Sequence, residues 1–268
     1  MTHADVLNLG LVPYSEAWEL QRAIAAEVAD GTRPDTILLL EHPPTITTGR
    51  RTDPGELHIP ADAVVDVVET DRGGKSTFHG PGQLVCYPIF DLTRHGQDVK
   101  RYCRDLEEAL IVTLAKVGVA GERIDGLTGV WLTRPPRKIA SIGIHVAKWV
   151  TTHGYALNVD LDPAPFTQWI TACGLEDAMF TTIAKELGRP ITVDDVRGPA
   201  LEALAEVFSL ALSAHDLVEW RARPRQRPPS FLRHRAQGVA PTEDAASGGE
   251  TSVGSVTLVC DGASSLQR

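Results

Sequence analysis

The most constraining feature of the sequence is that several strand-like segments follow one another with no helix between them. Three such runs, 129–133, 138–147 and 149–159, come directly after the clearest helical pattern, 98–117. A doubly wound parallel sheet needs strands and helices to alternate along the chain. The order of segments therefore predicts an α+β fold, in which a mixed β-sheet is flanked by helices.

Further elements follow from apolar runs and their capping residues. Within 98–117 the apolar residues recur at helical spacing, at Val99, Cys103, Leu106, Leu110 and Leu114. Strands are also expected at 6–12, 36–41, 45–48, 64–69 and 84–92. Helices are expected from Ser15 to Gly31, over 175–187, and from Thr192 to about 216, where Gly198-Pro199 could break the last one.

The composition changes after Trp220. Residues 221–235 are rich in arginine and proline, and residues 236–268 are rich in alanine, glycine, serine and threonine. So little apolar surface cannot offset the entropy lost on ordering the chain. We therefore expect one folded domain over 1–220 and a disordered C-terminal tail over 221–268.

Charge and hydropathy exclude several classes of protein. The net charge of −9 argues against a nucleic-acid partner, because such binders usually carry a basic excess. No run of 18 apolar residues is present, so no membrane-spanning helix is expected. The N-terminus has neither the basic nor the apolar region of a signal peptide. Together with four scattered cysteines, this predicts reduced thiols and a cytoplasmic location.

No metal site is predicted. The cysteines form no C-x-x-C pair, and His42, His79, His145 and His153 do not stand at metal-ligand spacing with one another. A histidine in a loop or strand is more often a hydrogen-bonded structural residue than a base.

The glycine-rich segment 72–83 allows two interpretations. Gly74-Lys75-Ser76 resembles the end of a phosphate-binding P-loop, but that motif requires glycine at position 69, which is Glu69. The segment can be a plain connection between strands. It can equally be a binding loop, because its glycines allow close backbone approach and its basic groups add charge.

Two residues stand out as candidates for chemistry. Cys173 precedes an expected helix, whose N-terminal dipole would lower a thiol pKa, although a buried loop cysteine is as plausible. Lys138 falls on the apolar face of the strand 138–147, where it either reaches water at the sheet edge or lines a pocket. Cys86 and Cys103 lie in apolar patterns typical of a core, and Cys260 lies in the expected tail.

Five segments in order resemble one family, the lipoyl(octanoyl) transferases. They are residues 41–50, 72–92, 138–143, 149–158 and 172–175, and the similarity extends over about 5–215. The resemblance implies a fold like the catalytic domain of lipoate and biotin protein ligases. It implies that Cys173 accepts the acyl group and that Lys138 activates the Cys173 thiol. It also implies that three segments line the acyl pocket: Arg72, Gly73, Gly74, Lys75, Ser76, Thr77, Phe78 and His79; Ser141, Ile142 and Gly143; Gly154, Tyr155 and Ala156.

The activity that the resemblance implies is the first step of endogenous protein lipoylation. An octanoyl (or lipoyl) group would pass from acyl carrier protein to a lysine of lipoyl domains, in 2-oxoacid dehydrogenases and in the glycine cleavage H protein. No cofactor is expected, because a thioester is already activated. Acyl carrier proteins are acidic, so basic side chains are candidates for docking: Arg50, Arg51, Arg72, Lys75, Arg134 and Arg137.

Three other functions remain open from the sequence. An ATP-dependent lipoate or biotin ligase would need nucleotide and free acid. A thioesterase would pass the acyl group to water. A non-catalytic carrier-binding protein would bind the donor without needing Cys173.

Overall fold

The computed structural model describes residues 1–171 and 179–222. Its main feature is a large mixed sheet, in the order β12-β1-β2-β6-β10-β9-β8-β7, with β11 paired to β9. The strands β1–β2, β1–β12 and β11–β9 pair in parallel, and the other pairs are antiparallel. The strands of this sheet are β1 (Thr2–Leu11), β2 (Asp35–Glu41), β6 (Gln83–Ile89), β7 (Glu122–Ile124), β8 (Leu127–Leu132), β9 (Arg137–Ala147), β10 (Val150–Asn158), β11 (Met179–Phe180) and β12 (Leu210–His215).

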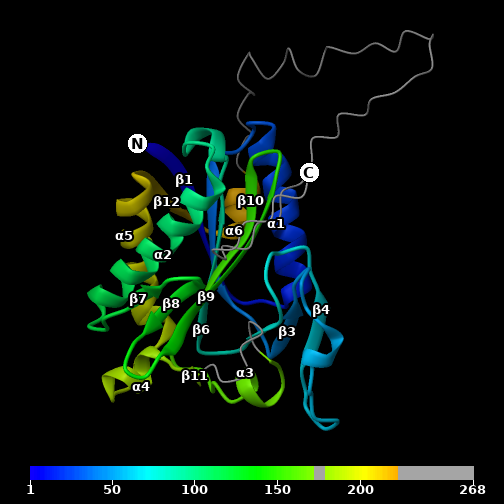
Figure 1. The fold of residues 1–268 in the computed structure, drawn as a ribbon. Coiled ribbons are helices and arrows are strands. Elements are labelled where there is room, and N and C mark those ends of the chain that lie inside the picture. Colours follow the sequence, from blue (N-terminus) through cyan, green and yellow to red (C-terminus); the bar gives the residue numbers. More distant parts are fainter. Residues whose placement is uncertain (172–178, 223–268) are drawn as a thin grey trace, which may run out of the picture.

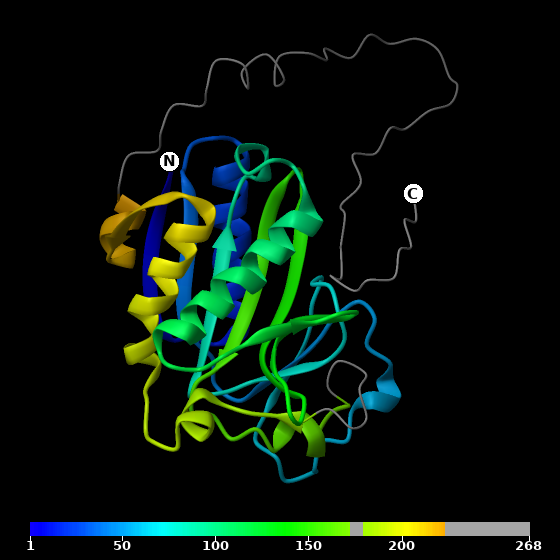
Figure 2. The ribbon, with the colours of Figure 1, turned by 60° about the vertical axis from the view of Figure 1, so that its left-hand side comes forward.

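A small second sheet stands beside one end of the large sheet (Figure 2). Its order is β4-β3-β5, from strands β4 (Asp66–Glu69), β3 (Thr45–Thr48) and β5 (Thr77–His79). The two sheets are joined through the chain between β5 and β6, and the small sheet packs on its own apolar cluster around Ile46, Phe78 and Phe166.

Helices cover both faces of the large sheet, which confirms the predicted fold class (Figure 1). One face packs against α2 (Val99–Lys116) and α5 (Val193–Phe208), and the other packs against α1 (Tyr14–Ala29). Shorter helices are η1 (Pro54–Glu56), η2 (Leu92–Arg94), α3 (Pro165–Gln168), α4 (Ile183–Leu187) and α6 (Leu217–Ala222).

The predicted helix at 98–117 is confirmed as α2. The Asp98 side chain caps it by accepting from the backbone N–H of Arg101. The apolar residues at helical spacing, Cys103 and Leu106 among them, are buried in the larger core. Thr192 caps α5 as predicted, and this helix continues through Pro199, which stands in its interior.

Three expectations about helices are wrong. The first helix begins at Tyr14 after Pro13, so Ser15 is not its cap. The last helix stops at Phe208, because Ser209 adopts a left-handed conformation and the chain then forms β12 against β1. Within the described part of that range, residues 179–187, Met179 and Phe180 form a strand that pairs with β9, and Ile183–Leu187 is helical. In both latter cases pairing with a distant strand outweighs local helix propensity.

The expected disordered tail lies almost wholly outside the described residues. Its first two residues complete α6, so the folded part extends at least to Ala222. The division into 1–220 and 221–268 otherwise stays a prediction. Across the two described ranges, no helix has the length and apolarity required to cross a membrane.

Candidate active site

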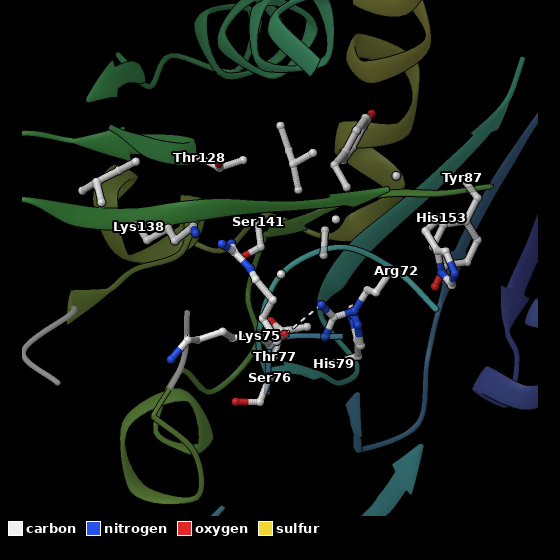
Figure 3. A pocket seen from close by; sticks show the side chains of 18 of the residues that line it. Arg72, Lys75, Ser76, Thr77, His79, Tyr87, Thr128, Lys138, Ser141 and His153 are labelled. Atoms are coloured by element: carbon white, nitrogen blue, oxygen red, sulfur yellow. Dashed lines mark hydrogen bonds between the residues drawn. The ribbon is translucent and has the colours of Figure 1, made fainter. Parts of the chain in front are cut away.

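A cavity of about 310 Å³ lies between the large sheet and the loop that leads into β5. Its walls come from segments that are far apart in the sequence: the start of α1, the loop 72–79, and strands β8, β9 and β10 (Figure 3). The lining residues are Tyr14, Arg51, Arg72, Gly74, Lys75, Ser76, Thr77, His79, Tyr87, Gly126, Leu127, Thr128, Trp131, Lys138, Ser141, Ile142, Gly143, His153, Gly154, Tyr155 and Ala156.

Two of the predicted pocket residues do not line this cavity. Phe78 points the other way, because successive side chains alternate across a strand, and its ring packs at 5.8 Å from those of Phe166 and Trp169. Gly73 instead ties the loop to β9, since its N–H donates to the carbonyl of Ile144 at 2.9 Å. Cys173 lies outside the described residues.

Arg72 organises the glycine-rich loop from within. The residue is 6% exposed, and its guanidinium donates to the backbone carbonyls of Thr47, Gly73 and Lys75 at 2.7–3.0 Å, and to the Thr47 hydroxyl. The loop then enters a strand, β5, whereas a P-loop enters a helix. The segment is therefore an ordered loop that lines the cavity, and the P-loop interpretation is excluded.

Lys138 is buried against an aromatic ring and does not reach water at the sheet edge. Only 4% of it is exposed, and its Nζ lies 5.1 Å from the centre of the Trp131 ring. Gly129 on β8 makes room for it. A Cβ atom there would lie 2.9 Å from Lys138 Cε and 2.4 Å from the Ala140 carbonyl oxygen. The strands thus place one ammonium group on the cavity wall.

The opposite end of the cavity is closed by tyrosine and histidine rings, of which the sequence pointed to the histidines, as hydrogen-bonded structural residues, but not to Tyr14 or Tyr87. Tyr14 donates its hydroxyl proton to Nδ1 of His153 at 3.1 Å, and His153 Nε2 donates to the Asp71 carboxylate at 2.8 Å. The Tyr87 hydroxyl donates to Nε2 of His42 at 2.7 Å. No sequence motif connects these residues, because each stands in a different apolar run or loop.

These histidines are held neutral by burial. Burial lowers the pKa of His42 to about 4, although the hydrogen bond from its Nδ1 to the Val12 carbonyl opposes the shift. Burial also lowers the pKa values of His79 and His153, and it raises the pKa of Tyr14 to about 12. The wall therefore carries no net charge from these rings at neutral pH.

The described residues on either side of 172–178 are anchored next to the cavity. Before it, the Thr171 N–H donates to the carbonyl of Glu56, whose carboxylate pairs with Lys75. After it, Phe180 lies opposite Lys138 in the sheet, and the Thr181 N–H donates to the Lys138 carbonyl at 3.0 Å.

The six predicted docking residues differ in their surroundings. Arg50, Arg51 and Arg134 are exposed, and the backbone N–H groups of the first two bond to the loop at Arg72 and Gly74. Arg72 is buried, so it cannot dock a partner. Arg137 forms a two-bond ion pair with Glu186.

In the part of the chain that the structure describes, titratable side chains do not gather into a metal centre. No group of three or more His, Cys, Asp or Glu residues suited to a metal ion occurs within 1–171 and 179–222.

Comparison with solved structures supports the fold. A bipartite lipoate protein ligase of Thermoplasma acidophilum superposes with a TM-score of 0.65 at 14% identity, covering 87% of this chain and 92% of that one. A lipoate-protein ligase A bound with ATP superposes with a TM-score of 0.64 at 14% identity, covering 87% of this chain and 93% of that one.

Sequence relatives are far more similar. The octanoyltransferase of Mycobacterium tuberculosis (strain H37Rv) is 50% identical over 222 residues, 82% of this chain and 94% of the relative. The octanoyltransferase of Chloroflexus aggregans is 47% identical over 215 residues, which cover 78% of this chain and 97% of the relative. The model of the lipoyl protein ligase A/B catalytic domain matches residues 13–205. These matches confirm the predicted resemblance to octanoyltransferases, and the chain belongs to the lipoyl protein ligase A/B catalytic domain family.

Proposed function

We propose that this protein is an acyltransferase that moves an octanoyl group from octanoyl-acyl carrier protein to a lysine of lipoyl domains. The observation that carries the proposal is the identity of about half the residues, over most of both chains, with octanoyltransferases. The cavity suits this activity, because it combines a buried ammonium group, Lys138, with apolar and aromatic lining residues such as Trp131 and Ile142.

In the first step, the Cys173 thiolate attacks the carbonyl carbon of the donor thioester. The carbon–sulfur bond to the carrier breaks, the carrier thiolate takes up a proton from Lys138, and the octanoyl group is held on Cys173 as a new thioester. This exchange of one thioester for another keeps the acyl group activated. A hydroxyl nucleophile would form a more stable ester and transfer poorly to an amine.

Lys138 supports the thiolate electrostatically. A unit positive charge about 4 Å from the sulfur, at an effective dielectric constant near 20, is worth roughly 4 kcal/mol. That is enough to favour the thiolate at neutral pH. Burial of Lys138 beside Phe180, near the end of the segment that carries Cys173, supports this pairing.

In the second step, the acceptor lysine amine attacks the Cys173 thioester. An amide bond forms, the carbon–sulfur bond breaks, and the proton lost by the amine ends on the Cys173–Lys138 pair. Backbone N–H groups near Gly74 and at Ser141–Gly143, which line the cavity, are the proposed donors to the oxyanion. The proposed acceptors are lipoyl domains of 2-oxoacid dehydrogenases and the glycine cleavage H protein, with the cytoplasm as the location.

Intact-protein mass spectrometry after incubation with octanoyl-acyl carrier protein tests the intermediate. We expect one octanoyl adduct on the wild type and none on Cys173→Ala. Cys86→Ala is the matched control and should retain the adduct, because Cys86 is fully buried and burial raises its pKa to about 12. An adduct on Cys173→Ala would contradict the mechanism.

The same incubation separates the alternatives when a lipoyl domain is added without nucleotide. Octanoylation of the domain supports the transferase. A requirement for ATP and free octanoate indicates a ligase, and release of octanoate to solution indicates a thioesterase. Carrier binding without any turnover indicates a binding protein.

A further inference from the structure

The cavity has two chemically different ends. Lys138 lies at one end, and Tyr87 and His153 lie at the other (Figure 3). The far end is a wall of four rings from four elements: Tyr14 at the start of α1, His79 on β5, Tyr87 on β6 and His153 on β10. All four are buried, and Tyr14 is 3% exposed.

The polar atoms of this wall are paired with protein groups. Besides the Tyr14–His153–Asp71 chain, Tyr87 bonds to His42, which bonds in turn to the Val12 carbonyl. His79 Nδ1 donates to the Gln83 side-chain oxygen at 2.8 Å. Because these groups satisfy one another, the rings offer mainly carbon surface to whatever fills the cavity. This explains how tyrosine and histidine can bound a site for an apolar chain.

Tyr14 is the central ring of the wall. Its ring centre lies 4.9 Å from that of His42 and 5.7 Å from that of His79, and its hydroxyl bonds to His153. We propose that Tyr14 sets the longest acyl chain that the cavity accepts, by closing the end opposite Lys138. This inference rests on the proposed function, because it takes the reacting carbonyl to lie near Lys138.

The side chains of this wall are held by hydrogen bonds, so they cannot move away to make room for a longer acyl chain. His153 is fixed from behind by Asp71, and its backbone N–H donates to Gln21 of α1 at 2.7 Å. His42 is fixed by the Val12 carbonyl. The same anchors remain when Tyr14 is truncated, so a smaller residue should extend the cavity while the other rings keep their places.

The test measures binding of hexanoate, octanoate, decanoate and dodecanoate to the full-length protein by isothermal titration calorimetry. We expect the wild type to prefer octanoate. Tyr14→Ala should prefer a longer acid, with the affinity ratio of decanoate to octanoate rising by about tenfold, the discrimination typical of one or two methylene groups. Tyr14→Phe is the matched control, because it keeps the ring and removes only the hydroxyl, and it should keep the octanoate optimum.

Tyr14→Leu serves the same purpose if Tyr14→Ala does not fold. An unchanged length profile in the truncated variant would overturn the proposal, as would equal shifts in Tyr14→Ala and Tyr14→Phe, which would assign the effect to the hydroxyl. Transfer assays with octanoyl- and decanoyl-carrier run in parallel. If no acyl group is transferred while the binding optimum still shifts, the proposed function fails and the role of Tyr14 stands.

Discussion

The ammonium group of Lys138 faces the ring of Trp131, with Nζ 5.1 Å from the ring centre. The two residues lie opposite each other on the paired strands β9 and β8. A cation over an aromatic face is stabilised by up to about 2 kcal/mol when both are removed from water. Trp131 is 2% exposed, so this contact helps to keep a charged lysine inside the protein.

Replacing the ring should therefore slow acyl transfer. We expect Trp131→Leu to lower kcat by about tenfold, because the leucine removes the π-face that faces the ammonium. Trp131→Phe keeps such a face and should retain most of the activity. Steady-state kinetics, with thermal melts to confirm folding, decide the point. Equal losses in both variants would show that only packing matters.

Gly129 should be sensitive to the smallest possible substitution. In Gly129→Ala, the new methyl group would meet the Ala140 carbonyl and Lys138 Cε, at a backbone φ of +100°. Gly96→Ala is the matched control, with φ of +88° and no atom within 4 Å of the added Cβ. Both variants should lose about 1–2 kcal/mol from the left-handed backbone. Only Gly129→Ala should lose stability beyond this common amount, and only Gly129→Ala should lose acyl-transfer activity. Thermal melts and transfer assays of the two variants in parallel measure both effects. Equal effects in the two variants would refute the argument that the added methyl group is crowded at Gly129.

His42 should make the fold less stable in mild acid. The unfolded chain binds a proton at His42 near pH 6.5, but the folded chain binds it only near pH 4, so stability is lost as the pH falls between these values. Between pH 7 and pH 5 this amounts to about 2 kcal/mol, and below about pH 4 the loss levels off.

Urea denaturation of the wild type and His42→Asn at pH 7 and pH 5 measures this contribution. His42→Asn should lose about 2 kcal/mol less than the wild type over that interval. His79 and His153, whose pKa values are also lowered, should keep some acid sensitivity in both proteins. Identical losses in the two proteins would show that His42 is not a buried neutral group.

Arg50 and Arg51 are the exposed arginines next to the loop that lines the cavity. If they dock the acidic carrier, Arg50→Gln combined with Arg51→Gln should raise KM for octanoyl-acyl carrier protein several-fold at low salt, with little change in kcat. Arg101→Gln, on the outer surface of α2, is the control for loss of charge alone. Unchanged KM at low salt would remove these two residues from the docking surface.

Local sequence was sufficient to predict much of the fold. The helix 98–117 carries its own cap and apolar face, and the successive runs from 129 to 159 form β8, β9 and β10. Prediction from local sequence failed where pairing with a distant strand determines the conformation. Leu210–His215 forms a strand because β1 offers an edge, and Met179–Phe180 does so because β9 offers one.

The sequence by itself determined the family, the class of fold and most of the cavity-lining segments, because ordered motifs and apolar periodicity are written locally along the chain. Only the tertiary structure decided that Lys138 is buried over Trp131, that Arg72 supports the loop from inside, and that Tyr14, Tyr87 and His153 close the far end of the cavity. Those facts depend on side chains brought together from up to 139 positions apart. Burial and pairing at such separations follow from how sheets and helices pack, and no local pattern records them.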